Sequence, residues 1–322
     1  GGVLGFATLA QKVIKGRKAS MIGTWILGII IFVDDYLNCL AVGAATRPIT
    51  DRNRVSREML AYIVNSTGVT VCAIVPFSTW GAFMSALMIE SGMGEGMTAF
   101  SAYVSAIPFV LYGWLAVIFV PLFALGVVPL FGPMKKAEKR TLETGQVLSD
   151  ESKAALIELP EEERAFEGKK CNALNFIIPI LVVTAVTIIT EDMVVALLVS
   201  ILVCLVMYLP QRLMSFTKFF DSAVKGMVDM FPVLILIIMA YELIIINEGL
   251  GMTDFVISGA LKALNPALLP VTIFVVIAAL SFASGSFWGL AAIAFPIVAP
   301  LAAAMDVNQF LCAGALISAV CA

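Results

Sequence analysis

The stretch from Ile29 to Trp80 reads IIIFVDDYLNCLAVGAATRPITDRNRVSREMLAYIVNSTGVTVCAIVPFSTW. Apolar sequence surrounds it, yet two aspartates, Asp34 and Asp35, directly follow five apolar residues. Ionisable groups at membrane depth are costly and rare, and by default they mark an ion or substrate path. The alternative is that the two aspartates lie at a helix end, in the interface with water.

The composition around this stretch is that of a multi-pass membrane protein. The 322 residues are 61% hydrophobic and 13% charged, and the mean hydropathy is +1.01. A soluble domain carries about 25% charged residues. We therefore expect an all-α polytopic protein with the lipid bilayer as its partner. The net charge of −3, without a basic face, gives no reason to expect nucleic acid binding.

Cysteine and histidine usage argues against a metal centre. The chain has six cysteines, none in a C-x-x-C pair, and no histidine. A zinc or iron–sulfur site needs such ligands in close spacing. We expect no transition metal and no cofactor. Because Gly1 is not an initiator methionine and Ala322 ends an apolar run, we also expect a fragment cut within membrane sequence.

The apolar segment before the aspartates poses a topological conflict. Residues 19–33 form a run of 15, whereas a straight helical span needs about 20. Basic residues lie on both sides, at 12–18 and at 47–57, and the positive-inside rule assigns both groups to the cytoplasm. A single crossing cannot satisfy this rule. A re-entrant or broken segment can, because irregular backbone is tolerated at depth where it lines a cavity.

A charged segment divides the chain. Residues 133–172 hold 17 charged residues and predict a solvated, cytoplasmic loop. It separates a first transmembrane half, 1–132, from a second, truncated half, 173–322. Within the second half, residues 212–225 alternate aromatic and charged residues, which is typical of an amphipathic interfacial segment.

Three predicted breaks interrupt the apolar runs with small hydroxyl, amide or glycine residues, at 34–38, 65–68 and 281–289. Broken helices expose carbonyls to cations and positive helix ends to anions, and they mark transporter sites. Small residues can instead serve close helix packing. Glu242, alone in an apolar run, could bind a proton or cation, or lie near the interface. The expected site residues are Asp34, Asp35, Asn38, Asn65, Ser66, Thr67, Glu242, Ser281, Ser284, Gly285 and Ser286.

Two further patterns are weaker. Residues 78–81 and 286–289 share S-x-W-G, either as a trace of internal duplication or by chance.

Arg47 and Asp51 are expected to form a structural charge pair at the end of the broken segment. Hard oxygen ligands suit an alkali cation, so a sodium ion is expected at Asp34 and Asp35. We favour Asp35 as the binding group, although the sequence does not orient the two.

The same stretch carries three motifs in order: D-D-Y-x-N from Asp34, R-P-x-T-D from Arg47, and S-R-E-M-L-A-Y-I-V-N-S-T from Ser56. It resembles the NhaC-type sodium/proton antiporters, as does SFASGSFWG from Ser281. The resemblance implies inverted repeats, two hairpins and a site between them. Asn65 stands where that family has aspartate. A motif like G-D-H-C-S-P-I-S-D is expected just past Ala322, so part of the site is expected outside this chain.

The predicted function is therefore sodium/proton antiport by alternating access in a bacterial inner membrane, with sodium ions and protons as transported species. The resemblance also leaves open sodium- or proton-coupled exchange of a small carboxylate or amino acid, such as malate or lactate. A homodimer is one assembly to test. A channel is a further alternative. An intramembrane aspartyl protease is disfavoured, because adjacent aspartates point about 100° apart on a helix. The protein is not expected to be an enzyme.

Overall fold

The computed structural model describes residues 14, 16–149, 172, 174–190, 192–229, 265–284 and 287–322, with single positions between 231 and 250. Every element in these ranges is helical, which confirms the all-α class. The chain divides into two compact units. Unit 1 comprises residues 1–72, 115–185 and 196–204, and unit 2 comprises residues 73–114, 186–195 and 205–322.

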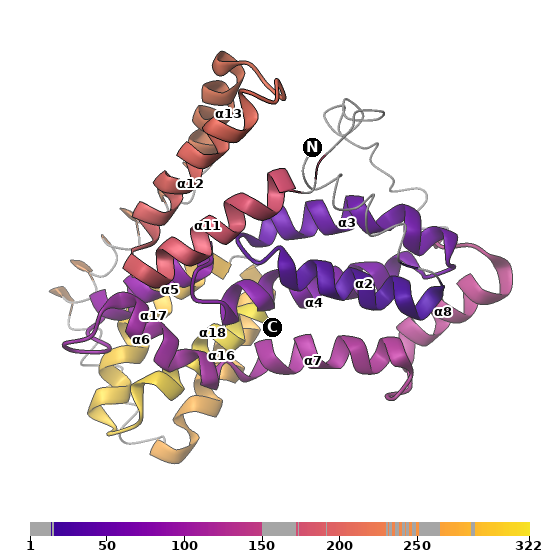
Figure 1. Cartoon of the computed structure of the whole chain (residues 1–322). Helices are drawn as coiled ribbons and strands as arrows, with labels where there is room; N and C mark the ends of the chain where they lie inside the picture. Colours follow the sequence, from indigo (N-terminus) through magenta and orange to yellow (C-terminus); the bar gives the residue numbers. More distant parts are fainter. Residues whose placement is uncertain are drawn as a thin grey trace. The chain divides into compact units, whose positions relative to one another are not determined.

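A helical hairpin opens unit 1. Helix α2 (Arg17–Ile30) and helix α3 (Asp35–Arg52) pack along each other (Figure 1). At 1.5 Å per residue, the 14 residues of α2 reach only about 21 Å, short of the ~30 Å hydrocarbon core. The hairpin therefore reverses within the apolar run, at Ile31–Asp34, as the short span predicted.

The Glu138 carboxylate connects the two ends of the hairpin that lie opposite its reversal, namely the start of α2 and the residues after α3. Glu138, on helix α8 (Gly132–Thr144), is buried. Its Oε1 accepts a hydrogen bond from the Ser56 backbone N–H at 2.9 Å, and its other oxygen forms an ion pair with Arg17. The start of α2 and the residues after α3 thus meet at one end of unit 1. This is the arrangement that the two basic flanks predicted.

Further ion pairs reinforce this end. Arg140 on α8 contacts the Glu58 carboxylate, with both oxygens 3.0 Å from Nη2. The Asp51 carboxylate binds the Arg57 guanidinium at 2.8 and 2.6 Å. We expected Arg47 to pair with Asp51, but the structure pairs Asp51 with Arg57 instead. Arg57 can reach it because the chain turns at 53–56 and brings the start of the next helix back to the end of α3.

The charged segment 133–172 begins as packed structure, which differs from the solvated loop that we expected. In α8, Ala137, Glu138 and Thr141 are buried, and their spacing places them on one helix face. Residues 150–171 lie outside the described residues.

Helix α4 (Arg57–Ile74) continues unit 1, and helix α7 (Leu111–Leu125) returns to it. Met59 and Ile63 on α4 share an apolar cluster with Val120 and Ala124 on α7 and Met21 on α2. The predicted break at residues 65–68 is wrong, because α4 is continuous there. The chain breaks later, around Pro76, before helix α5 (Thr79–Glu90). Pro76 lacks a backbone donor, whereas α4 continues through Gly68.

Unit 2 contains the helix that follows the break around Pro76 and the two helices on either side of residues 285–286. Its helices are α5, α6 (Ala99–Ala106), η1 (Ile107–Phe109), α13 (Phe216–Asp229), η2 (Pro266–Leu268), α16 (Leu269–Ser284), α17 (Phe287–Ala304) and α18 (Gln309–Cys321). Helices α16 and α17 both pack on α18, and α5 packs on α6 and α17. The amphipathic segment expected over 212–225 lies largely in α13. Helices α11 (Leu174–Thr190) and α12 (Met193–Tyr208) contribute residues to both units.

Several of these helices are long and apolar enough to cross a membrane. Two qualify by themselves, at residues 266–283 and 287–304, and the number rises to four if each of two bent helix pairs forms one span. These counts refer to the described residues. Together with the apolar composition, they identify a multi-pass membrane protein.

The shared end of the hairpin predicts its sidedness. In a cysteine-free background, Arg54→Cys and Lys139→Cys should react from the same side of the membrane, because both exposed positions belong to the end tied by Glu138. An impermeant thiol reagent applied to intact cells and to inverted membranes measures this. Labelling of position 54 from outside the cell, with position 139 protected, would contradict the hairpin.

Glu138 should also contribute measurably to stability. Glu138→Ala leaves the Arg17 charge and the Ser56 N–H without their acceptor, so we expect a loss of about 3 kcal/mol in unfolding free energy. Glu143→Ala is the matched control on the same helix. Its ion pair with Lys139 is exposed, so its loss should stay within about 0.5 kcal/mol. Unfolding in detergent compares the two variants. Equal losses of unfolding free energy would contradict the stabilising role of the Glu138 contacts with Ser56 and Arg17.

Candidate functional site

The tip of the α2–α3 hairpin is held by one side chain. The Asn38 amide donates from Nδ2 to the backbone oxygens of Gly28 and Ile31, each at 2.7 Å. Gly28 lies in the last turn of α2 and Ile31 is its C-cap residue, where backbone carbonyl groups have no acceptor role within the helix and need another donor. Asn38 is fully buried, so no water competes for these bonds. The asparagine therefore closes the end of one helix from the first turn of the next.

The same turn carries the candidate carboxylate. Asp35 is the first residue of α3 and is only 6% exposed, whereas Asp34 precedes the helix and is half-buried. Asp35 and Asn38 are three residues apart on one helix face. Asn38 Oδ1 is buried and has no hydrogen-bond donor among the described residues. The tip thus presents a buried carboxylate and an available amide oxygen side by side.

Helix α4 supplies the surface beneath the tip. A methyl group added at Gly28 would lie 2.3 Å from the Thr67 hydroxyl oxygen, so α2 and α4 approach closely there. At Gly68 the corresponding distance to Asn38 Oδ1 is 3.6 Å, which places the amide oxygen against α4. The Cys72 thiol lies 3.1 Å from the Phe32 carbonyl oxygen and contacts the reversal itself.

Of the predicted site residues in unit 1, the structure brings together Asp34, Asp35, Asn38 and Thr67. The Thr67 hydroxyl donates to Ile63 O at 2.7 Å within its own helix, which leaves its lone pairs facing α2. Ser66 is buried on α4. Asn65 is exposed, so the three consecutive residues 65–67 do not share one environment.

The remaining predicted residues belong to unit 2. Ser281 is buried on α16 and donates to Val320 O of α18 at 3.3 Å. Ser284 is the last residue of α16, and Gly285 and Ser286 lie outside the described residues. Trp288, at the start of α17, packs on Trp80 of α5 with ring centroids 5.4 Å apart, so the tryptophans of the two S-x-W-G copies meet.

Glu242 is helical and exposed. Among the described residues, no three His, Cys, Asp or Glu side chains are grouped as a metal site would need. Sequence reasoning missed the close approach of Gly28 to Thr67. The only signal was a glycine within an apolar run, and many membrane helices carry one.

Helices broken within apolar sequence, with a buried carboxylate at the break, are the features of a secondary transporter. A family model for the Na+/H+ antiporter family matches residues 71–322, most of the chain. The chain belongs to the Na+/H+ antiporter family, whose members are transporters and not enzymes. The match begins within α4, so the α2–α3 hairpin precedes it.

A second comparison covers the hairpin as well. An uncharacterized protein of Haemophilus influenzae is 30% identical over 329 aligned residues. The alignment covers 94% of this chain, and the chain spans 61% of that protein's length. No solved structure matches the chain significantly.

The close approach of α2 and α4 makes Gly28 sensitive to substitution. Gly28→Ala should lower the unfolding free energy by about 1–3 kcal/mol, because the added methyl group collides with Thr67. Gly43→Ala on α3 is the control, since nothing lies within 4 Å of the added methyl group there. It should be neutral or stabilising by up to about 1 kcal/mol. Unfolding in detergent measures both variants. A harmless Gly28→Ala change would show that the helices do not meet as described.

Proposed function

We propose that the protein containing this chain exchanges sodium ions for protons by alternating access, as a member of the NhaC type in a bacterial inner membrane. The observation that carries the proposal is the burial of Asp35 beside the Asn38 amide oxygen at a helix break. Family membership supports cation/proton antiport as the class of activity.

The electrostatics of the tip favour a cation bound to a carboxylate. The N-terminal end of α3 carries a partial positive charge that stabilises the Asp35 anion in apolar surroundings. The carboxyl end of α2 carries a partial negative charge that favours a cation nearby. Carboxylate and amide oxygens are hard ligands, which suit an alkali ion. Asp35 and Asn38 Oδ1 would supply two of them, and Asp34 is close enough in sequence to add a third.

Exchange follows when one carboxylate serves both ions. A deprotonated Asp35 binds sodium, and a proton that neutralises it removes the main attraction for the cation. Binding of the two ions is therefore mutually exclusive. If the site switches its access from one side of the membrane to the other only when sodium or a proton is bound, sodium flux in one direction drives proton flux in the other.

Exchange of a small carboxylate or amino acid is the competing prediction from the sequence. Such a substrate needs a fixed positive group for its carboxylate, such as the helix N-terminus at the tip. That end of α3 already faces its own carboxylate at Asp35. The charge at the tip therefore favours a cation over an anion.

The test is sodium-driven proton movement by the full-length protein in proteoliposomes, read with a pH-sensitive dye. Asp35→Asn removes the charge and the proton site together, so exchange should fall to the level of protein-free vesicles. Asp34→Asn is the matched control, and it should retain measurable exchange because Asp34 is less buried. In the wild type, apparent sodium affinity should weaken as pH falls, because protons occupy the site.

Wild-type exchange and an unchanged pH profile in both variants would remove the hairpin from the mechanism and leave Glu242 as the remaining candidate carboxylate. Proton movement driven by a small carboxylate or an amino acid, and not by sodium, would establish the competing function instead.

A further inference from the structure

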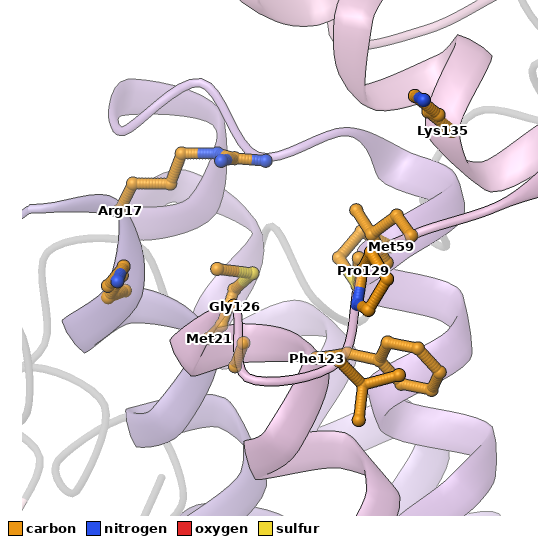
Figure 2. Close-up of a pocket in the computed structure, with 11 residues that line it drawn as sticks. Arg17, Met21, Met59, Phe123, Gly126, Pro129 and Lys135 are labelled. Carbon is orange, nitrogen blue, oxygen red and sulfur yellow. The ribbon is translucent and has the colours of Figure 1, made fainter.

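A cavity of about 310 Å³ lies in unit 1, at the end of the hairpin opposite the candidate ion site. The first turn of α2, the end of α7 and the segment leading into α8 surround it (Figure 2). Arg17, Lys18 and Lys135 line its polar part, and Met21, Met59 and Phe123 line its apolar part. The cavity therefore combines cationic and apolar walls.

The charge on the walls is positive. No acidic side chain is among the described residues that line the cavity. Arg17 is offset by its ion pair with Glu138. Lys18 donates from Nζ to the Leu125 carbonyl oxygen at 2.7 Å, which fixes the ammonium group and leaves its charge in place. Lys135 adds a second ammonium group, so the cavity suits an anion.

The surroundings indicate that this anion carries an apolar tail. Val127 and Phe131, in the segment between α7 and α8, are 68% and 73% exposed. Large apolar side chains so exposed beside lysines are typical of a protein surface at the membrane interface. A volume of about 310 Å³ is at the lower limit for small-molecule pockets, which suits a lipid headgroup rather than a whole lipid.

We propose that this cavity binds the headgroup of an anionic phospholipid, with its phosphodiester between Lys18 and Lys135 and its glycerol against Met21, Met59 and Phe123. Basic pockets between membrane helices on the cytoplasmic side bind acidic headgroups. The positive-inside rule assigns this basic end of unit 1 to the cytoplasm. The site is separate from the ion site and does not depend on the transported species. A free phosphate ion shares the chemistry of the headgroup but would leave the apolar wall uncovered.

The experiment measures lipid binding to the purified full-length protein by native mass spectrometry, with dioleoylphosphatidylglycerol and dioleoylphosphatidylcholine as probes. The protein should bind the anionic lipid more tightly. Lys135→Gln should weaken that binding about fivefold, the usual contribution of one basic residue near an anionic surface. Lys136→Gln is the matched control, because it removes the same charge from the neighbouring exposed position outside the cavity.

A second variant separates the cavity from general charge attraction. Val128→Trp fills the apolar part and keeps every cation, so a pocket predicts weaker binding of the anionic lipid, whereas diffuse attraction predicts no change. Equal losses in the two lysine variants, or equal affinity for both lipids, would overturn the site. Displacement of the anionic lipid by millimolar inorganic phosphate would overturn the lipid as its occupant.

Discussion

Two hydrogen bonds from the Asn38 amide allow a helix to end inside apolar sequence. A chain that reverses within a membrane leaves carbonyl groups without water or a continuing helix, at a cost of several kcal/mol for each unsatisfied group. Asn38 satisfies the carbonyls of Gly28 and Ile31. The reversal in turn fixes the start of α3, and so the position of Asp35. The geometry of the candidate ion site is thus a consequence of how the backbone carbonyl groups at the reversal are hydrogen-bonded.

The two ends of the hairpin are stabilised in opposite ways. At the tip, hydrogen bonds from the neutral Asn38 amide and a close approach of Gly28 to Thr67 hold the chain. At the base, charged groups do so, with Glu138 accepting from Ser56 and pairing with Arg17. The buried carboxylate of Asp35 therefore lies at the opposite end of the hairpin from the ion pairs of Arg17, Arg57 and Arg140.

The sequence predicted the hairpin because three local signals agreed: a run too short to span, an aspartate pair after it, and basic residues on both sides. It also predicted a break at 65–68 that does not form, since the hydroxyls near Gly68 bond within their own helix, as Thr67 does to Ile63, and do not interrupt it. The roles of Glu138 and of Arg57 opposite Asp51 could not be predicted, because they depend on contacts between distant or turned segments. The sequence favoured Asp35 over Asp34 without orienting the pair, and the greater burial of Asp35 in the structure supports that choice.

The tie at Glu138 also bears on how the protein is made. Ser56 and Glu138 are 82 residues apart in the chain, so at about 5–20 residues per second the ribosome needs roughly 4–16 s to deliver the carboxylate after the hairpin is complete. During that interval the hairpin has its tip closed by Asn38 and its base open. The positive-inside rule assigns both ends to the side of synthesis, so the arginines at 47–57 need not be translocated. The membrane-insertion and quality-control machinery therefore encounters the hairpin before Glu138 connects its two ends.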